Sequence, residues 1–182
     1  METFLTPATS TIYQNHGNPN KKEEVIFIVD DDPMYLEALE YQLKHLQKYD
    51  IYSFKTGEIC LENMWHNPKI VVLDYYLNSD NPTAIDGIEV LKKIKSEYPE
   101  TEVIMLSSQD NMEVAINTID EGAYDYVTKG ESAFIRIRNI VENITAGIEL
   151  NESLQKGTLL YKRVTITVII LFVLFFILSR IL

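Results

Sequence analysis

Cysteine and basic residues are scarce in this chain of 182 residues. The single cysteine, Cys60, cannot form an internal disulfide, and no second cysteine or histidine stands at ligand spacing to complete a zinc site with it. Lysine and arginine number 16 against 27 aspartates and glutamates, so the formal net charge is -11. A nucleic-acid-binding surface needs clustered lysine and arginine to neutralise phosphates, and this composition therefore argues against a nucleic-acid partner.

The two ends of the chain differ from its middle. Residues 1–22 are rich in threonine, asparagine and proline and lack the basic start and apolar core of a secretory signal, so we expect a disordered N-terminal arm. Residues 164–182 include the uncharged run "VTITVIILFVLFFIL". As a helix they would span about 28 Å, close to the roughly 30 Å hydrocarbon core of a bilayer. We expect a transmembrane helix here, the alternative being a buried core helix.

Basic residues flank this apolar run. Lys156, Lys162 and Arg163 precede it, and Arg180 near the chain end can reach the far interface. By the positive-inside rule, the part of the chain before the run lies on the cytoplasmic side of the cell membrane, with residues 151–163 as a juxtamembrane linker. We expect no output domain after residue 150, because the roughly thirty remaining residues are too few for a second core.

Between these ends, short apolar runs alternate with longer stretches that carry apolar residues at helical spacing. Strands are expected at residues 25–29, 51–54, 70–73, 102–106 and 124–127. Strict alternation of five strands with helices predicts an α/β domain over residues 23–150, with a five-stranded parallel sheet that is doubly wound, with helices on both faces.

Polar side chains gather where the expected strands end. The residues in question are Asp30, Asp31 and Asp32 after the first strand, Asp74 after the third, Ser107 and Ser108 after the fourth, and Lys129 after the fifth. Ligands of such sheets bind beyond the carboxyl ends of the strands, so we expect most of this set to form one site. Asp32 is the exception, because an aspartate directly before Pro33 is typical of a helix N-cap.

The composition of this set indicates its chemistry. Asp30, Asp31 and Asp74 would concentrate negative charge, and Mg²⁺ suits carboxylate ligands while leaving positions for phosphate oxygens. A phosphoryl group on Asp74 would then be neutralised by the metal, by the Lys129 ammonium and by the Ser107 hydroxyl.

The chain resembles the receiver domain of two-component response regulators over residues 23–150. The matching segments are "IFIVDDDP", "IVVLDYYL", "DGIEVLKKIK", "VIMLSSQD" and "GAYDYVTKG". The resemblance implies a flavodoxin-like fold and a phosphorelay function, in which Asp74 accepts a phosphoryl group from a histidine kinase or a phosphotransfer protein. Such a protein is a signalling phospho-acceptor rather than an enzyme acting on other substrates.

The resemblance also implies roles for single residues. The Mg²⁺ ligands would be Asp30, Asp31, Asp74 and the backbone carbonyl of Tyr76, with Asp31 as a direct ligand. Ser107 is similar to the family's switch hydroxyl, Tyr126 to its aromatic switch residue, and Lys129 to the lysine that pairs with the phosphoryl group.

Two features depart from the family pattern. The stretch from Asp74 to Asp86 is longer than is usual, and the extra residues in "LNSDNPTAID" would lie beside the site. Lys129 is followed by Gly130, where the family usually has proline. Glycine permits unusual backbone geometry without a cis bond, so the lysine would be held more loosely.

Our first interpretation is therefore a membrane-anchored phospho-receiver that signals through its surface to an unknown downstream protein, with homodimer formation left open. One alternative is a receiver-fold scaffold that docks a membrane partner without phosphorylation. Another is a magnesium-dependent aspartyl phosphatase using Asp30 and Asp32, although Met34 departs from that pattern. The apolar residues from Phe134 to Ile148 at 3-4-3-4 spacing either pack on the sheet or extend as a coiled-coil seam.

Overall fold

The computed structural model describes residues 24–46, 48–77 and 84–181, with the backbone alone for residues 171–176 and 178–181. The expected disordered arm at 1–22 lies outside the described residues. So does most of the long loop that precedes the third main helix, at residues 78–83.

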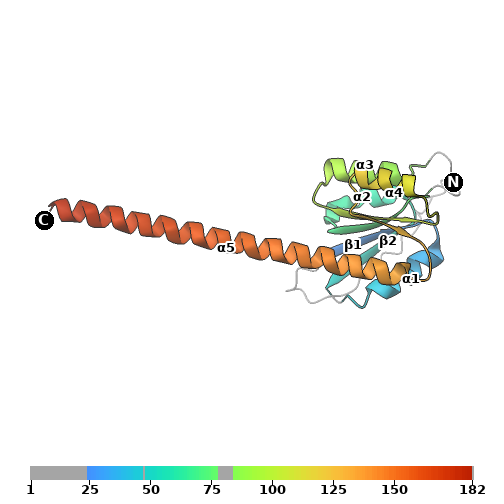
Figure 1. Cartoon of the computed structure of the whole chain (residues 1–182), viewed down its shortest axis with the longest axis horizontal. Helices are drawn as coiled ribbons and strands as arrows, with labels where there is room; N and C mark the ends of the chain where they lie inside the picture. Colours follow the sequence, from blue (N-terminus) through green and yellow to red (C-terminus); the bar gives the residue numbers. More distant parts are fainter. Residues whose placement is uncertain (1–23, 47, 78–83, 182) are drawn as a thin grey trace, which may run out of the picture. The chain divides into compact units, whose positions relative to one another are not determined.

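The described residues form alternating strands and helices, as predicted (Figure 1). The strands are β1 (Glu24–Val29), β2 (Tyr49–Phe54), β3 (Ile70–Asp74), β4 (Glu102–Ser107) and β5 (Asp125–Thr128). The helices are α1 (Pro33–Leu43), α2 (Gly57–Glu62), the 3-10 helix η1 (Met64–His66), α3 (Gly87–Glu97), α4 (Met112–Asp120) and α5 (Ala133–Ile181). Each expected strand is present, with bounds that differ by one or two residues.

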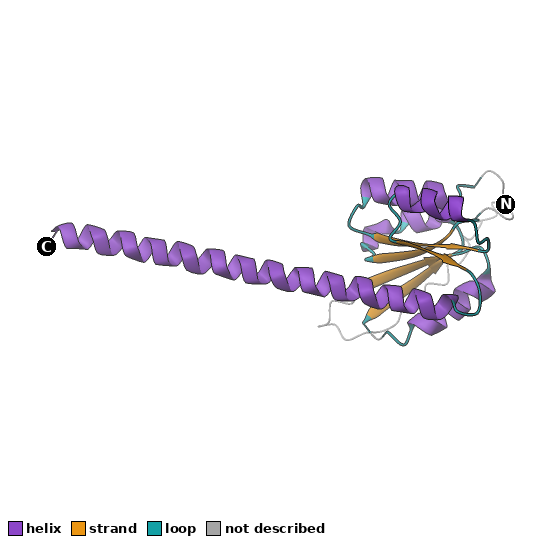
Figure 2. Cartoon of the chain, in the orientation of Figure 1, coloured by secondary structure: helices purple, strands orange, loops and turns teal. Residues whose placement is uncertain are grey.

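All five strands are parallel, in the order β2-β1-β3-β4-β5. Figure 2 shows α2, α3 and α4 on one face of the sheet, with α1 and the first turns of α5 on the other. The chain runs from β1 outward to β2 and then back past β1 to β3, so strand order reverses between β1 and β3. This is the position at which open α/β sheets bind ligands.

The central strands are apolar because helices cover both of their faces. Every residue of β3 is buried, and Phe27, Leu73 and Met105 are completely inaccessible to solvent. Burial of each such side chain contributes about 1.5–3 kcal/mol. The same packing fixes the strand ends rigidly, which positions the polar residues that follow them.

The first helix begins where the sequence indicates. The Asp32 side chain accepts a hydrogen bond from the backbone N–H of Met34 at 2.9 Å, and Pro33 is the first helical residue. Asp32 is exposed. The N-cap prediction for Asp32 is confirmed.

The chain divides into two compact units, Met1–Ile140 and Val141–Leu182, and α5 contributes residues to both. Ile137 and Ile140 are buried, as the packing alternative for this part of α5 predicts. The helix continues through Gly147 and Gly157, each of which costs about 1 kcal/mol relative to alanine in a helix interior.

Among the residues with described side chains, no helix is both long and apolar enough to cross a membrane. The predicted transmembrane helix at 164–182 falls largely on residues whose side chains lie outside that description. The C-terminal residues are described only as part of α5.

Candidate functional site

Three aspartates meet at the carboxyl ends of β1 and β3. Carboxylate oxygens of Asp30, Asp31 and Asp74 lie within 4.8 Å of one another, and we call these residues the acidic triad. Asp30 is completely buried and Asp74 is 3% exposed. The predicted convergence of these side chains is confirmed.

Backbone hydrogen bonds fix the two buried members of the triad. The Asp30 N–H donates to the carbonyl of Phe54 on β2, and the Asp30 side chain accepts from the Asp32 N–H at 3.0 Å. Next to Asp74, the Tyr75 N–H donates to the carbonyl of Leu106 on β4 at 2.8 Å. Asp74, at the end of β3, is therefore held beside the neighbouring strand β4.

Lys129 brings its ammonium group into the triad. Its Nζ lies 2.7 Å from Asp30 Oδ2 and 3.1 Å from Asp74 Oδ1, so one cation bridges two buried carboxylates. The Lys129 backbone N–H donates to the carbonyl of Ser107 at 2.7 Å, which attaches the end of β5 to the end of β4. The structure thus places Lys129 in the site, as predicted.

One ammonium does not neutralise three carboxylates. Burial and the negative charge of Asp30 raise the pKa of Asp74 to about 6, against the opposing effect of Lys129. Burial likewise raises the pKa of Asp30 against the opposing effect of Lys129. For Lys129, burial lowers the pKa, but the hydrogen bonds and charges of Asp30 and Asp74 together outweigh it and leave that pKa raised.

The uncompensated charge fits a hard divalent cation. All three donors are carboxylate oxygens, they are within chelating distance of one another, and no thiolate or imidazole is among them. Mg²⁺ prefers such oxygen ligands and keeps several waters. The residues present therefore fit the predicted magnesium site.

Tyr76, whose backbone carbonyl is the fourth predicted ligand, follows two residues after Asp74, and its side chain is 36% exposed. Its ring lies edge-on to that of Tyr75. The role of its carbonyl stays a prediction.

The two predicted switch residues are connected through Gln109. The Ser107 hydroxyl, which is buried at the end of β4, accepts a hydrogen bond from the Gln109 N–H at 3.1 Å. The Tyr126 hydroxyl donates to the Gln109 carbonyl at 2.7 Å, and the Tyr126 side chain is 8% exposed. The backbone of Gln109 thus links the hydroxyl beside the triad to the aromatic ring on β5, which the sequence did not predict.

Gly87 is a second residue whose importance the sequence did not reveal. A Cβ atom at this position would lie 2.1 Å from the carbonyl oxygen of Asp74 and 2.8 Å from Cα of Tyr75. The Gly87 N–H donates to the Tyr75 carbonyl at 3.0 Å. Only glycine lets the start of α3 approach the backbone of Asp74 so closely.

The described end of the long loop is attached to α2. The Ile85 N–H donates to a Glu58 carboxylate oxygen at 3.0 Å, and this bond, with others to the carboxylate, lowers the pKa of Glu58. Ile85 therefore has a fixed position next to α3, although the tip of the loop at 78–83 lies outside the described residues.

Tyr35, in the first turn of α1, also borders the site. Its ring centroid lies 4.6 Å from Lys129 Nζ and 5.1 Å from the ring centroid of Phe134, on which it stacks. Burial and the charges of Asp30 and Asp74 raise the pKa of Tyr35 to about 12. The available signal was an aromatic residue four positions after Asp31, at the start of the helix that follows the acids.

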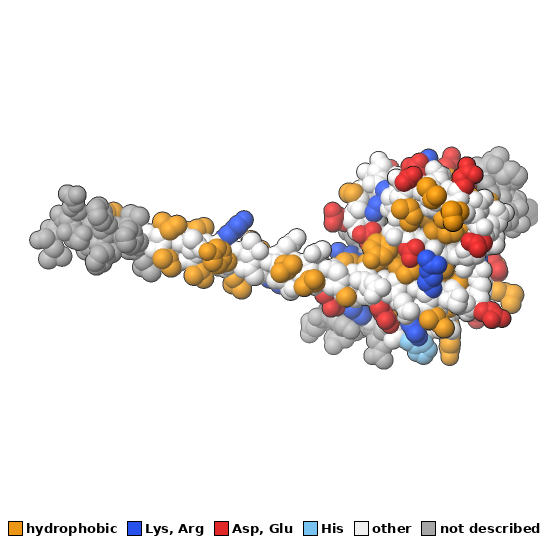
Figure 3. Space-filling model, in the orientation of Figure 1, with side chains coloured by type: hydrophobic (Ala, Val, Ile, Leu, Met, Phe, Trp, Pro, Cys, Tyr) orange, Lys and Arg blue, Asp and Glu red, His pale blue; other side chains and the backbone are white. Residues whose placement is uncertain are grey.

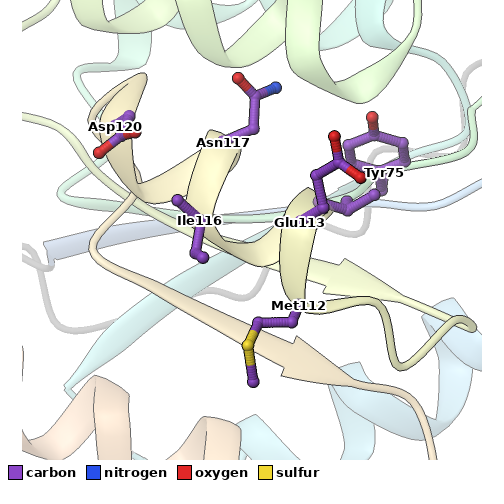
Figure 4. Close-up of a pocket in the computed structure, with 7 residues that line it drawn as sticks. Tyr75, Met112, Glu113, Ile116, Asn117 and Asp120 are labelled. Atoms are coloured by element: carbon purple, nitrogen blue, oxygen red, sulfur yellow. The ribbon is translucent and has the colours of Figure 1, made fainter.

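A surface pocket of about 720 Å³ lies beside Tyr75, the residue after Asp74. Figure 4 shows Glu113 and Asn117 projecting from one side of α4, and Met112 and Ile116 from the other. Met112 is 79% exposed and Ile116 is 56% exposed. In Figure 3, hydrophobic side chains gather over α4 with acidic side chains around them.

Comparison with known proteins agrees with this geometry. The sequence profile of the response regulator receiver domain matches residues 26–142. The nitrogen assimilation regulatory protein NtrX of Azorhizobium caulinodans is 33% identical over 105 residues, which are 57% of this chain and 22% of that protein. The transcriptional regulatory protein KdpE of Mycobacterium tuberculosis is 32% identical over 132 residues, 70% of this chain and 55% of that protein. The chain thus matches only part of the length of these curated relatives.

Solved structures give the same result. The BeF3-activated DrrB receiver domain is 31% identical, with a TM-score of 0.56 over 66% of this chain and 98% of that one. The receiver domain of NtrX from Brucella abortus is 28% identical, with a TM-score of 0.58 over 65% of this chain and 96% of that one. The chain belongs to the response regulator receiver domain family, whose members are phospho-acceptor signalling modules that partner histidine kinases.

Proposed function

We propose that this protein takes a phosphoryl group from a histidine kinase or a phosphotransfer protein onto Asp74, with Mg²⁺ held by the acidic triad and the Tyr76 carbonyl. The observation that carries the proposal is the position of Lys129, which bridges Asp30 and Asp74 inside a buried cluster of carboxylates. Such a group is placed to pair with new negative charge on Asp74. Support also comes from the family match and from the related DrrB domain, which is described as BeF3-activated.

In the proposed transfer, a carboxylate oxygen of Asp74 attacks the phosphorus of a phosphohistidine. An O–P bond forms, the N–P bond breaks, and the electron pair stays on the imidazole nitrogen of the donor. Mg²⁺ would neutralise developing charge on the phosphoryl oxygens when bound. Lys129 is positioned to do the same from the other side, and the Ser107 hydroxyl donates to a phosphoryl oxygen once it turns from Gln109.

The docking scaffold is the alternative that remains, in which the fold binds a partner and Asp74 is never modified. A cluster whose charges are not balanced is a costly feature for a scaffold, because buried carboxylates destabilise a fold unless they are paired. The phosphatase alternative is weaker. It requires Asp32 as a second catalytic acid, and Asp32 is instead exposed and caps α1.

For the downstream signal, we propose the α4 pocket as the contact surface. It borders Tyr75, and its exposed apolar side chains are flanked by Glu113 and Asp120. A partner helix with apolar residues and lysine or arginine beside them would complement it.

Location at the cell membrane, with the receiver domain on the cytoplasmic side, is a separate proposal. It is supported by described apolar side chains late in α5, of which Val164, Ile166 and Val168 are each more than half exposed. Sodium carbonate washing of host membranes should leave the full chain in the pellet, and the double variant Val168→Arg, Ile170→Arg should be released. Release of the unaltered chain contradicts membrane insertion.

The proposed acceptor is tested by incubating the purified protein with Mg²⁺ and acetyl phosphate. We expect an acid-labile phosphoryl adduct that requires the metal and is absent from Asp74→Asn. The control is Asp50→Asn, which alters an aspartate on β2 outside the triad and should be labelled like the original chain. Labelling that survives Asp74→Asn would show that the acceptor is a different residue.

A further inference from the structure

The backbone around Lys129 restricts this side chain only weakly, although its ammonium has a well-defined position. Its backbone N–H donates a hydrogen bond to the Ser107 carbonyl. The next residue, Gly130, lies in open space, since a Cβ added to it would have no heavy atom within 4 Å. The long methylene stem of lysine carries several rotatable bonds, and ordering it costs conformational entropy. The ion pairs with Asp30 and Asp74 hold the end of this stem, and a further contact beside the ammonium would limit its remaining freedom.

Tyr35 supplies such a contact. Lys129 Nζ lies 4.6 Å from the centroid of the Tyr35 ring, within the range of a cation–π interaction. The ring is held in turn by stacking on Phe134 at 5.1 Å, with 30° between the ring planes. These three side chains come from α1, from the end of β5 and from the start of α5, and they meet at Lys129, which pairs with two residues of the acidic triad.

The Tyr35 hydroxyl does not explain the position of this residue. It is buried and makes no hydrogen bond with any of the residues that the structure describes. A buried hydroxyl without a partner costs free energy, so a phenylalanine would suit the fold at least as well. The ring, rather than the hydroxyl, is the part of Tyr35 that contacts functional groups.

We propose that the ring of Tyr35 is a positioning element that holds the Lys129 ammonium at the phosphoryl site, in place of constraint by the residue after the lysine. The inference rests on the proposed phosphoryl transfer to Asp74. It adds that the rate of this transfer depends on an aromatic face at position 35, which acts through Lys129 and does not touch the phosphoryl group.

The contact itself is tested without metal or phosphodonor, by NMR of the lysine side chains in the full chain. A methylene next to an ammonium over a ring is shifted upfield by the ring current. We expect the Cε methylene of Lys129 to show this shift in the unaltered chain and in Tyr35→Phe, and to lose it in Tyr35→Leu. A Lys129 signal that is unchanged by Tyr35→Leu overturns the proposal.

The consequence for transfer is tested with Mg²⁺ and acetyl phosphate. Tyr35→Leu should slow phosphorylation by roughly 3- to 10-fold, the range that a partly buried cation–π contact supports, while Tyr35→Phe should match the unaltered chain. Tyr41→Leu is the matched control, since Tyr41 lies on the same helix with its side chain 65% exposed. Equal slowing by Tyr35→Phe and Tyr35→Leu overturns the role of the ring.

A double-mutant cycle separates positioning from a general effect on the fold. In a Lys129→Met background, Tyr35→Leu should cause no further slowing, because the group that it positions is gone. Slowing of the same size in both backgrounds means that Tyr35 acts on something other than Lys129, and the proposal fails. If the unaltered chain takes no phosphoryl group, the proposed function fails instead, and the NMR result still decides whether Tyr35 holds Lys129.

Discussion

Two regions of this protein depart from the usual distribution of residues in opposite ways. At the ends of β1 and β3, charged side chains are buried: Asp30 is completely inaccessible and Asp74 is 3% exposed. In the second unit, apolar side chains are exposed, and Leu159 and Leu160 are 60% and 63% accessible (Figure 3). Buried charge and exposed apolar surface are both costly, and both are informative about binding.

The two regions differ in how far other residues of the chain offset the free-energy cost of buried charge or of exposed apolar surface. In the acidic triad, Lys129 already neutralises part of the negative charge, and the unbalanced remainder fits a divalent cation. In α5, nothing among the described residues specifies a ligand of comparable chemistry. A buried charged site therefore defines its ligand more narrowly than an exposed apolar helix does.

The largest expected effect on stability is that of Lys129→Met. It removes the cation between Asp30 and Asp74 and leaves two buried carboxylates beside each other. We expect a loss of about 3–5 kcal/mol in the free energy of unfolding at neutral pH in metal-free protein, measured by urea denaturation. The loss should be smaller at pH 5, where the carboxylates can bind protons. An equal loss at both pH values would mean that charge is not its cause.

The next prediction concerns pH. The pKa of Asp74 is about 6 in the folded protein and has its ordinary value of 3.8 in the unfolded chain. The folded state thus binds the proton more tightly, so the stability that this proton provides is fully present below pH 3.8 and is lost as pH rises through 6. Relative to Asp74→Asn, metal-free protein should lose up to about 3 kcal/mol across this window.

That difference is measured by urea denaturation of both proteins from pH 4 to 7. The comparison with Asp74→Asn removes the contribution of other titrating groups. A stability difference that stays constant over this range would show that folding does not raise the pKa of Asp74.

Binding of Mg²⁺ should reduce the electrostatic repulsion among the buried carboxylates and so stabilise the fold. At a concentration 100-fold above its dissociation constant, Mg²⁺ should stabilise the folded protein by about 2.7 kcal/mol, measured as a rise in the urea midpoint at pH 7.5. Asp31→Asn should abolish most of this gain. Asp32→Ser is the matched control, because serine also caps helices and Asp32 lies outside the triad. An equal loss of stabilisation by Mg²⁺ in both variants would mean that the metal does not bind through Asp31 as proposed.

Gly87→Ala should be less disruptive than loss of the lysine but clearly measurable. A methyl group there would overlap the carbonyl of Asp74, and α3 or the acceptor residue must move. We expect about 1–3 kcal/mol of destabilisation together with slower phosphorylation. Gly130→Ala is the matched control, since that position has open space around it and the same change should have little effect.

The smallest expected effect on stability is that of a substitution on the exposed part of α5. Leu160→Gln replaces a side chain that is 63% exposed with another good helix former, so the free energy of unfolding of the first unit should change by less than about 0.5 kcal/mol. A loss above 1 kcal/mol would mean that this side chain is covered in the folded protein, and the contrast between the two regions would then weaken.

Most of the fold was predictable from the sequence because strand and helix periods alternate without ambiguity. The acidic triad and Lys129 were predictable too, since parallel strands bring their carboxyl ends to one edge of the sheet. Gly87 and Gln109 were not, because their importance lies in a backbone approach to Asp74 and in hydrogen bonds of a peptide group. Neither leaves a pattern in side-chain chemistry.

The C-terminal segment shows the opposite limit. Its apolar run predicts a membrane span from hydropathy alone, whereas no helix among the described side chains is both long and apolar enough to cross a membrane. An apolar run indicates only that a segment avoids water. The acids, hydroxyls and lysine at one edge of the sheet indicate which class of ligand the site binds.

The most direct test of the central claim is peptide mapping by mass spectrometry after treatment with Mg²⁺ and acetyl phosphate. We expect one phosphoryl group per chain, removed by hydroxylamine and located on the peptide that contains Asp74. A phosphoryl group on any other residue, or none at all in protein that binds Mg²⁺, would contradict it.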